Sequence, residues 1–274
     1  NSSVQTALPV GETAQLFVRA TGVLLTNQVT FQTEGASFEP QIECQDSNPT
    51  LLWSWSDGTT TTDYPVVSKV FDSAATRLQE LVVHPSNALT KINLGFDGVD
   101  GGEVVPLEMC EPQNVSAVTF AEPLTQLKVF AASYNPLVGA LDFTGFANLQ
   151  YIECYHCPDL ERIETSNLPS LERINVEDCG LLELDLSGNP KLGDVRCALN
   201  EFTNIVVGAG TGPAIWHWCT RDNPQLTQQF QDVMTDFYSL EQFWVYNNNQ
   251  RGHLSLVSTN LRSVWAHDNH YSSA

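Results

Sequence analysis

The chain has 274 residues, of which 42% are hydrophobic and only 16% charged, so its composition is that of a folded protein rather than of a disordered acidic segment or a coiled coil. Its 32 acidic residues outnumber its 12 basic residues, and the net charge of −20 disfavours nucleic acids and anionic membrane surfaces as partners. No apolar run reaches the roughly eighteen residues that a membrane-spanning helix needs, so we expect no membrane insertion.

Residues 1–86 hold short apolar runs, several of them alternating with polar residues and separated by Gly, Asp and Asn. This pattern predicts a small antiparallel β-sandwich. Within it, Trp53, Trp55, Asp57 and Gly58, followed by Phe71, resemble the hairpin motif of the polycystic-kidney-disease (PKD) type of immunoglobulin-like module. The resemblance implies a spacer or presenting module on an extracellular protein.

Residues 87–123 are predicted to be a linker and an irregular N-terminal cap. The segment 97–103 gathers three acidic residues among glycines, which leaves open a calcium site or a tight acidic turn. We favour the turn, because the spacing of an EF-hand loop is absent. A weak match to the repeat described next falls at Val104, Leu107 and Met109.

Residues 124–274 contain a repeat with apolar residues at fixed offsets, closed by Asn or Cys. The closing residues are Asn135, Cys157, Cys179, Asn200, Asn223, Asn248 and Asn269. Their separations of 22, 22, 21, 23, 25 and 21 residues identify a repeat array of about seven units, in which successive units stack into a solenoid.

Each unit fits the offsets L-x-x-L-x-L-x-x-N/C. We expect a short strand in the middle of the unit, with the closing Asn turned inward to satisfy buried backbone groups. Cys, a small apolar residue with a weak S–H donor, is predicted to replace Asn in this row and to occupy inward strand positions. A second apolar motif at Leu141, Ile163, Leu184 and Leu254 predicts short strands on the convex side.

These units resemble the 21–22-residue leucine-rich repeats of bacterial surface proteins, including internalin-like adhesins and Bacteroidetes surface proteins with a Cys/Asn ladder. The resemblance covers about residues 104–274 and implies a mainly β protein at the cell surface or secreted from the cell. It says little about the ligand, because such arrays bind very different partners.

Side chains at outward strand positions, and in the turns just after them, are predicted to form the concave binding face. Aromatic residues lie at both ends of this set, Arg, Asp and His lie between them, and Lys is absent, which is the composition of a binding surface. The alternative is that neighbouring aromatic rings merely pack along the sheet. The predicted ligand-binding residues are Tyr134, Tyr151, Tyr155, His156, Arg173, Arg196, His217, Arg221, Asp222, Trp244, Tyr246, Trp265 and His267.

Two clusters contain residue types that metal or catalytic sites use. Cys154, His156 and Cys157 have the spacing of a zinc motif, but a second ligand pair is missing, so buried ladder cysteines are the preferred interpretation. His217, Cys219 and Asp222 are predicted to lie at outward strand or turn positions of one repeat, so that a Cys–His pair is exposed together, yet a nucleophile also needs an oxyanion site and a pocket. We therefore predict no catalytic residues, no metal and no cofactor.

Cys44 and Cys110 lie outside the ladder, and the sequence leaves open whether they form a disulfide. Taken together, the sequence predicts a non-catalytic extracellular adhesion protein that recognises a protein or a glycan. The alternative is self-assembly through the solenoid ends as a subunit of an extracellular filament or a phage-like fibre.

Overall fold

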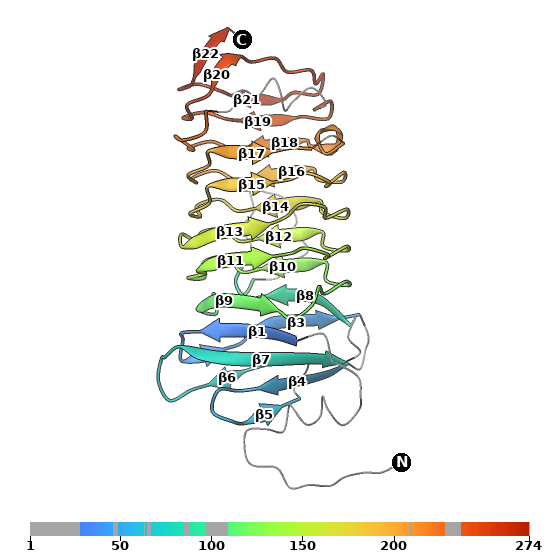
Figure 1. The fold of residues 1–274 in the computed structure, drawn as a ribbon, viewed down its shortest axis with the longest axis vertical. Coiled ribbons are helices and arrows are strands. Elements are labelled where there is room, and N and C mark those ends of the chain that lie inside the picture. The colour runs from blue at the N-terminus through green and yellow to red at the C-terminus, as the bar shows by residue number, and fades with distance from the viewer. Residues whose placement is uncertain are drawn as a thin grey trace.

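The computed structural model describes residues 28–45, 49–62, 64, 67–84, 88–96, 109–208, 210–227 and 237–273. In this part of the chain the protein is mainly β, and the only helix is a single 3-10 turn, η1 (Gly212–Ala214). Figure 1 shows an elongated molecule in which a sheet formed by the N-terminal strands lies at one end of a long stack of short strands. The predicted fold class of a mainly β chain with a C-terminal solenoid is confirmed.

The N-terminal strands form an antiparallel sheet in the order β5-β4-β7-β1-β9. Two further strands, β2 and β6, pair with each other. The bounds of these strands are β1 (Gln28–Thr33), β2 (Ser37–Phe38), β4 (Thr50–Ser54), β5 (Thr60–Thr61), β6 (Lys69–Val70), β7 (Arg77–His84) and β9 (Val115–Phe120).

Aromatic rings fill the space between this sheet and the β2–β6 pair. Phe38 lies 5.4 Å from Phe31 and 5.9 Å from Trp53, measured between ring centroids. Trp53 stacks on Trp55 with an angle of 4° between the ring planes. All four side chains are buried, so the apolar alternation read from β1 and β4 points into one core.

A nine-stranded sheet runs the length of the solenoid in the order β21-β19-β18-β16-β14-β12-β10-β8-β3 (Figure 1). From β8 onward neighbouring strands are parallel, whereas β3 is antiparallel to β8 and covers its free edge. The bounds are β3 (Gln41–Cys44), β8 (Leu89–Asn93), β10 (Val129–Ala131), β12 (Tyr151–Glu153), β14 (Arg173–Asn175), β16 (Asp194–Arg196), β18 (His217–Cys219), β19 (Gln242–Trp244) and β21 (Ser263–Trp265).

The opposite side of the solenoid carries a second series of short strands that pair two by two, β11 with β13, β15 with β17 and β20 with β22. Their bounds are β11 (Gly139–Asp142), β13 (Leu160–Glu164), β15 (Glu183–Asp185), β17 (Asn204–Val206), β20 (Arg251–His253) and β22 (His270–Ser273). Strands thus occupy three of the four predicted convex motifs, while Leu254 lies just beyond β20.

The closing row of Asn and Cys lies inside the solenoid, as the register predicts. Asn200 is buried, and its amide nitrogen donates to the carbonyls of Val176, Cys197 and Ala198 at 2.8–3.3 Å. Cys179 takes the same place one turn earlier, where its thiol donates to the Cys154 carbonyl at 3.0 Å. Buried backbone groups between turns are thereby paired, which removes a desolvation cost of about 1–3 kcal/mol for each group.

The segment predicted to join the two parts contains the first parallel strand, β8. Leu89 and Ile92 are buried, and β8 pairs with β10 in the register of the later turns. Strand pairing also links the N-terminal strands to the solenoid, since β3 pairs with β8 in the nine-stranded sheet and β9 pairs with β1 in the N-terminal sheet. Of the weak early repeat, only Met109 lies in the described residues, and it is exposed.

Candidate functional site

The outer face of the nine-stranded sheet, called the sheet face below, carries the predicted binding residues in rows. Each three-residue strand points its middle side chain into the solenoid and its first and third side chains outward, and the strands pair in register. Equivalent residues of successive strands therefore lie side by side. One row contains Tyr151, Arg173, Asp194 and His217, and the next contains Glu153, Asn175, Arg196 and Cys219.

A cluster of charged side chains occupies the middle of the sheet face. Arg173 Nε lies 2.7 Å from Glu153 Oε1, and Arg173 Nη1 lies 3.3 Å from Asp194 Oδ2. The Asp194 carboxylate also contacts two other side chains: its Oδ1 atom lies 2.7 Å from His217 Nδ1, and its Oδ2 atom lies 3.1 Å from Arg196 Nη2. We call these five residues the ion cluster.

Burial and charge shift the pKa values inside the ion cluster. Burial raises the pKa of Glu153 well above its usual value, and the negative charge of Asp194 raises it further. Burial also acts to raise the pKa of Asp194, but the hydrogen bond from His217 and the charge of Arg196 outweigh it, and the pKa falls below its usual value. Burial lowers the pKa of Arg173 to about 10.

The prediction that His217 and Cys219 are exposed together is wrong. His217 lies beneath the ring of Trp244, 5.0 Å away between ring centroids, and only 3% of its surface is exposed. Cys219 is 1% exposed, and its thiol lies 3.6 Å from Glu177 Oε1. Burial, together with the charge of Glu177, raises the pKa of Cys219 to about 12, which keeps the thiol protonated and unreactive at neutral pH.

One edge of the sheet face is lined by residues in the left-handed backbone conformation. In every turn this residue immediately precedes the inward Asn or Cys, and its φ lies between 53° and 59°. The row consists of Tyr134, His156, Asp178, Leu199, Asp222, Asn247 and Asp268. The conformation turns the chain sharply after the strand and leaves most of these side chains exposed.

A first aromatic cluster lies at this edge, over β10 and β12. Tyr134 meets Tyr155 edge-to-face at 5.1 Å and lies 5.3 Å from the ring of His156, measured between ring centroids. The Nδ1 atom of His156 pairs with the carboxylate of Asp178 in the next turn. Tyr134 is 37% exposed and His156 is exposed, so the cluster offers an apolar ring surface with polar groups beside it.

A second aromatic cluster covers β18, β19 and β21. Trp244 stacks on Trp265 with centroids 5.3 Å apart, and Tyr246 stacks on His267 at 4.8 Å. The guanidinium of Arg221 lies 5.9 Å from the centroid of the Tyr246 ring. Trp265, on the last strand of the sheet order, is half exposed.

The thirteen predicted binding residues thus differ in accessibility. Arg173 and His217 are buried, which corrects the expectation that their side chains present themselves to a ligand. Half-buried are Tyr151, Tyr155, Arg196, Arg221, Asp222, Trp244 and Tyr246, and exposed are Tyr134, His156, Trp265 and His267.

The sheet face also contains a lysine, which the sequence interpretation missed because it did not recognise β8 as a strand of this sheet. Lys91 lies beside Val129 in the parallel register, and its ammonium pairs with Glu43 on β3. Since Lys91 is buried, it does not present its charge to a ligand.

The remaining chemical candidates are four cysteines and the acidic segment 97–103. Cys154 and Cys157 are buried while His156 faces outward, as the repeat register predicts. Cys44 and Cys110 both carry thiols rather than a disulfide. Among the described residues no group of three or more His, Cys, Asp and Glu side chains is placed to hold a metal ion. The acidic segment 97–103 lies outside the described residues.

No protein-family model matches this chain, and the search of curated proteins gives no match. Within the described residues no helix has both the length and the apolar character needed to cross a membrane.

Proposed function

We propose that this chain is a non-catalytic binding protein of an extracellular surface, and that its sheet face recognises a protein or a glycan. The observation that carries the proposal is the exposed edge of that face, where Tyr134, Tyr155 and His156 gather beside Asp178. Exposed rings next to directional hydrogen-bonding groups are typical of the energetic centre of an interface.

The contacts within the ion cluster support this proposal, because they hold the strands beneath the exposed side chains in fixed positions. Its five side chains join four neighbouring strands through contacts of 2.7–3.3 Å, so they fix the spacing of the exposed side chains beside them. A surface that is already ordered loses less conformational entropy when a ligand binds. The cluster therefore positions the binding groups without itself touching the ligand.

The finer family assignments belong to the same proposal. The inward Asn/Cys row supports a leucine-rich repeat of the bacterial surface type. The stacked Trp53 and Trp55, followed by a turn in which Gly58 has a φ of 81°, support a PKD-like N-terminal module in a β-sandwich. Both assignments favour presentation of the solenoid outside the cell.

Binding arrays test the proposal. The fluorescently labelled protein is applied to immobilised glycans and to a library of extracellular proteins, alongside the double variant Tyr134→Ala/Tyr155→Ala. We expect at least tenfold weaker binding by this variant, about 1.4 kcal/mol or more, because truncation of a ring anchor costs about 2 kcal/mol. The matched control Val138→Ala/Leu182→Ala removes two exposed apolar side chains outside the sheet face and is expected to leave binding unchanged. Equal binding by all three proteins, or no binding by any, would contradict the proposal.

The alternative function, self-assembly into a filament, is tested by light scattering over a concentration series. The sheet ends at β21, where Val264 and Trp265 are exposed. Growth of the scattering mass with concentration, abolished by Trp265→Ala, would favour assembly through this strand over recognition of a different molecule. A constant monomer mass would leave the binding proposal as the better one.

A further inference from the structure

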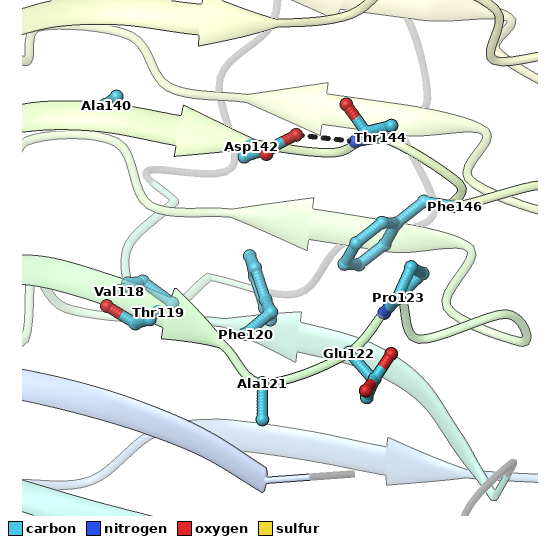
Figure 2. A pocket seen from close by; sticks show the side chains of 10 residues that line it. All are labelled: Val118, Thr119, Phe120, Ala121, Glu122, Pro123, Ala140, Asp142, Thr144 and Phe146. Atoms are coloured by element: carbon cyan, nitrogen blue, oxygen red, sulfur yellow. Dashed lines mark hydrogen bonds between the residues drawn. The ribbon is translucent and has the colours of Figure 1, made fainter. Parts of the chain in front are cut away.

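A cavity of about 360 Å³ lies on the side of the solenoid opposite the sheet face, between β9 and β11 (Figure 2). Its walls come from the C-terminal half of β9 with the turn that follows, and from β11 with the turn that follows. Phe120, Glu122, Asp142, Thr144 and Phe146 supply its chemically distinctive lining.

The cavity exists because two sheets meet here without merging. β9 pairs with β1 in the N-terminal sheet, whereas β11 pairs with β13 in a separate sheet. A backbone hydrogen bond from Val138 to the Ser116 carbonyl, 2.8 Å long, joins the two sides near the start of β9. Farther along the two strands, at Phe120 of β9 and Asp142 of β11, the space between them opens into the cavity (Figure 2).

The two walls direct backbone polar groups toward the cavity. The Ala121 amide donates to the Gln28 carbonyl on β1, so the amide and carbonyl of Phe120, one residue earlier, face away from β1 and toward β11. By the same alternation, the Phe143 amide donates to Glu164 on β13, and the backbone of Asp142 faces β9. Carbonyl oxygens, which accept hydrogen bonds, therefore border the cavity on both sides.

An aromatic wall lines one part of the cavity. The half-buried ring of Phe120 lies 5.0 Å from Phe146 and 5.9 Å from Phe143, measured between ring centroids, in edge-to-face and tilted arrangements. This packing fixes the Phe120 ring while leaving part of it accessible. The face of an aromatic ring attracts cations, with a gain of about 0.5–1 kcal/mol at exposed sites.

The charged groups of the lining are both acidic. Asp142 Oδ1 accepts the Thr144 amide at 2.8 Å, and hydrogen bonds from the side chain and the backbone of Thr144 hold the pKa of Asp142 below its usual value. Glu122 adds a second, exposed carboxylate, and none of the lining residues is Lys, Arg or His. Arg162, on the neighbouring strand, pairs with Glu164 at 2.7 Å, and its positive charge also contributes to the lowered pKa of Asp142.

We propose that this cavity is a binding site for an alkylguanidinium or alkylammonium group, the chemistry of an arginine or lysine side chain or of a free organic amine. The carboxylate of Asp142 and the backbone carbonyls would accept its N–H donors, and the Phe120 ring would cover its alkyl stem and charge. This site is separate from the sheet face and does not depend on the function proposed for that face.

The test is titration of the whole chain with three probes, followed by calorimetry or by amide chemical shifts. The probes are N-acetyl-arginine amide, its neutral isostere N-acetyl-citrulline amide, and butylguanidine. We expect saturable binding of the arginine probe and at least tenfold weaker binding of the citrulline probe. Butylguanidine binding as tightly as the arginine probe identifies the alkyl cation alone as the ligand, whereas tighter binding of the arginine probe shows that a peptide backbone contributes; either result supports the site.

Two variants and a control make the test specific. Asp142→Asn retains an oxygen for the Thr144 amide but removes the charge, and about tenfold weaker binding is expected, equivalent to the lower end of a charge-assisted hydrogen bond. Asp185→Asn is the matched control, because Asp185 makes the same 2.8 Å contact with Ser187 on a strand away from the cavity. Ala140→Leu, which extends a side chain into the space, is expected to abolish binding. Equal affinity for arginine and citrulline, or unchanged affinity in both cavity variants, would overturn the proposal.

Discussion

The replacement Arg173→Met tests whether the ion cluster stabilises the solenoid. Methionine retains most of the apolar stem but removes the guanidinium that lies between Glu153 and Asp194. The side chains of Arg173, Glu153 and Asp194 are 5%, 1% and 4% exposed, so the two acids lose a buried counterion. Removal of one partner from a buried ion pair costs about 3–5 kcal/mol, and we expect a loss of this size in the free energy of unfolding.

Arg162→Met provides the control within the same solenoid. Arg162 pairs with Glu164 at the same 2.7 Å nitrogen–oxygen distance, but its side chain is 66% exposed. An exposed pair contributes about 0–1 kcal/mol, so this variant should unfold close to the parent protein. Both variants remove an arginine that makes a 2.7 Å contact with a glutamate, and the two sites differ in burial and in the second contact of Arg173 with Asp194.

Urea unfolding followed by tryptophan fluorescence gives both free energies, because four of the six tryptophans, Trp216, Trp218, Trp244 and Trp265, lie in the solenoid. Asp194 keeps its contacts with Arg196 and His217 in Arg173→Met, whereas Glu153 loses its 2.7 Å ion pair. A double variant, Glu153→Gln/Arg173→Met, removes that carboxylate and should recover at least about 1 kcal/mol relative to the sum of the single changes. Losses below about 1 kcal/mol for both Arg173→Met and Arg162→Met would refute the reasoning.

Three further predictions concern single side chains. Because folding raises the pKa of Glu153, its contribution to stability is complete below the unfolded value near 4.5 and is lost as the pH rises toward the folded value. The free energy of unfolding of Glu153→Gln, relative to that of the parent protein, should therefore be higher at pH 7 than at pH 4, measured by urea unfolding at each pH. Since burial raises the pKa of Cys219 to about 12, its alkylation at pH 8 should require unfolding, and mass spectrometry of the native protein showing rapid modification there would contradict this. Asn200→Ala leaves the Leu181 amide and the Val176 carbonyl without their partner and should cost about 2–4 kcal/mol in urea unfolding, whereas Asn200→Cys should cost less, because cysteine fills this row in two other turns.

The repeat spacing determined much of the solenoid from the sequence alone. A fixed period places every inward side chain in the same environment, so the burial of Cys157, Cys179 and Asn200 followed from their positions. The strand β8 escaped this reasoning although Leu89 and Ile92 have the repeat offsets, because the next unit begins only at Leu127 and the period is interrupted.

The sequence also placed the outward side chains on one face, but it did not decide which of them a ligand can reach. Strand register brings Arg173, Asp194 and His217 into adjacent positions, and strands about 4.8 Å apart leave long side chains no room to extend separately, so they pair and bury one another. The cavity beside Asp142 likewise had no sequence signal, since Asp185 occupies the equivalent position with the same turn contact. The cavity arises because β9 pairs with β1 in the N-terminal sheet. This pairing joins segments that are far apart in the sequence, so the periodicity of the repeat does not predict it.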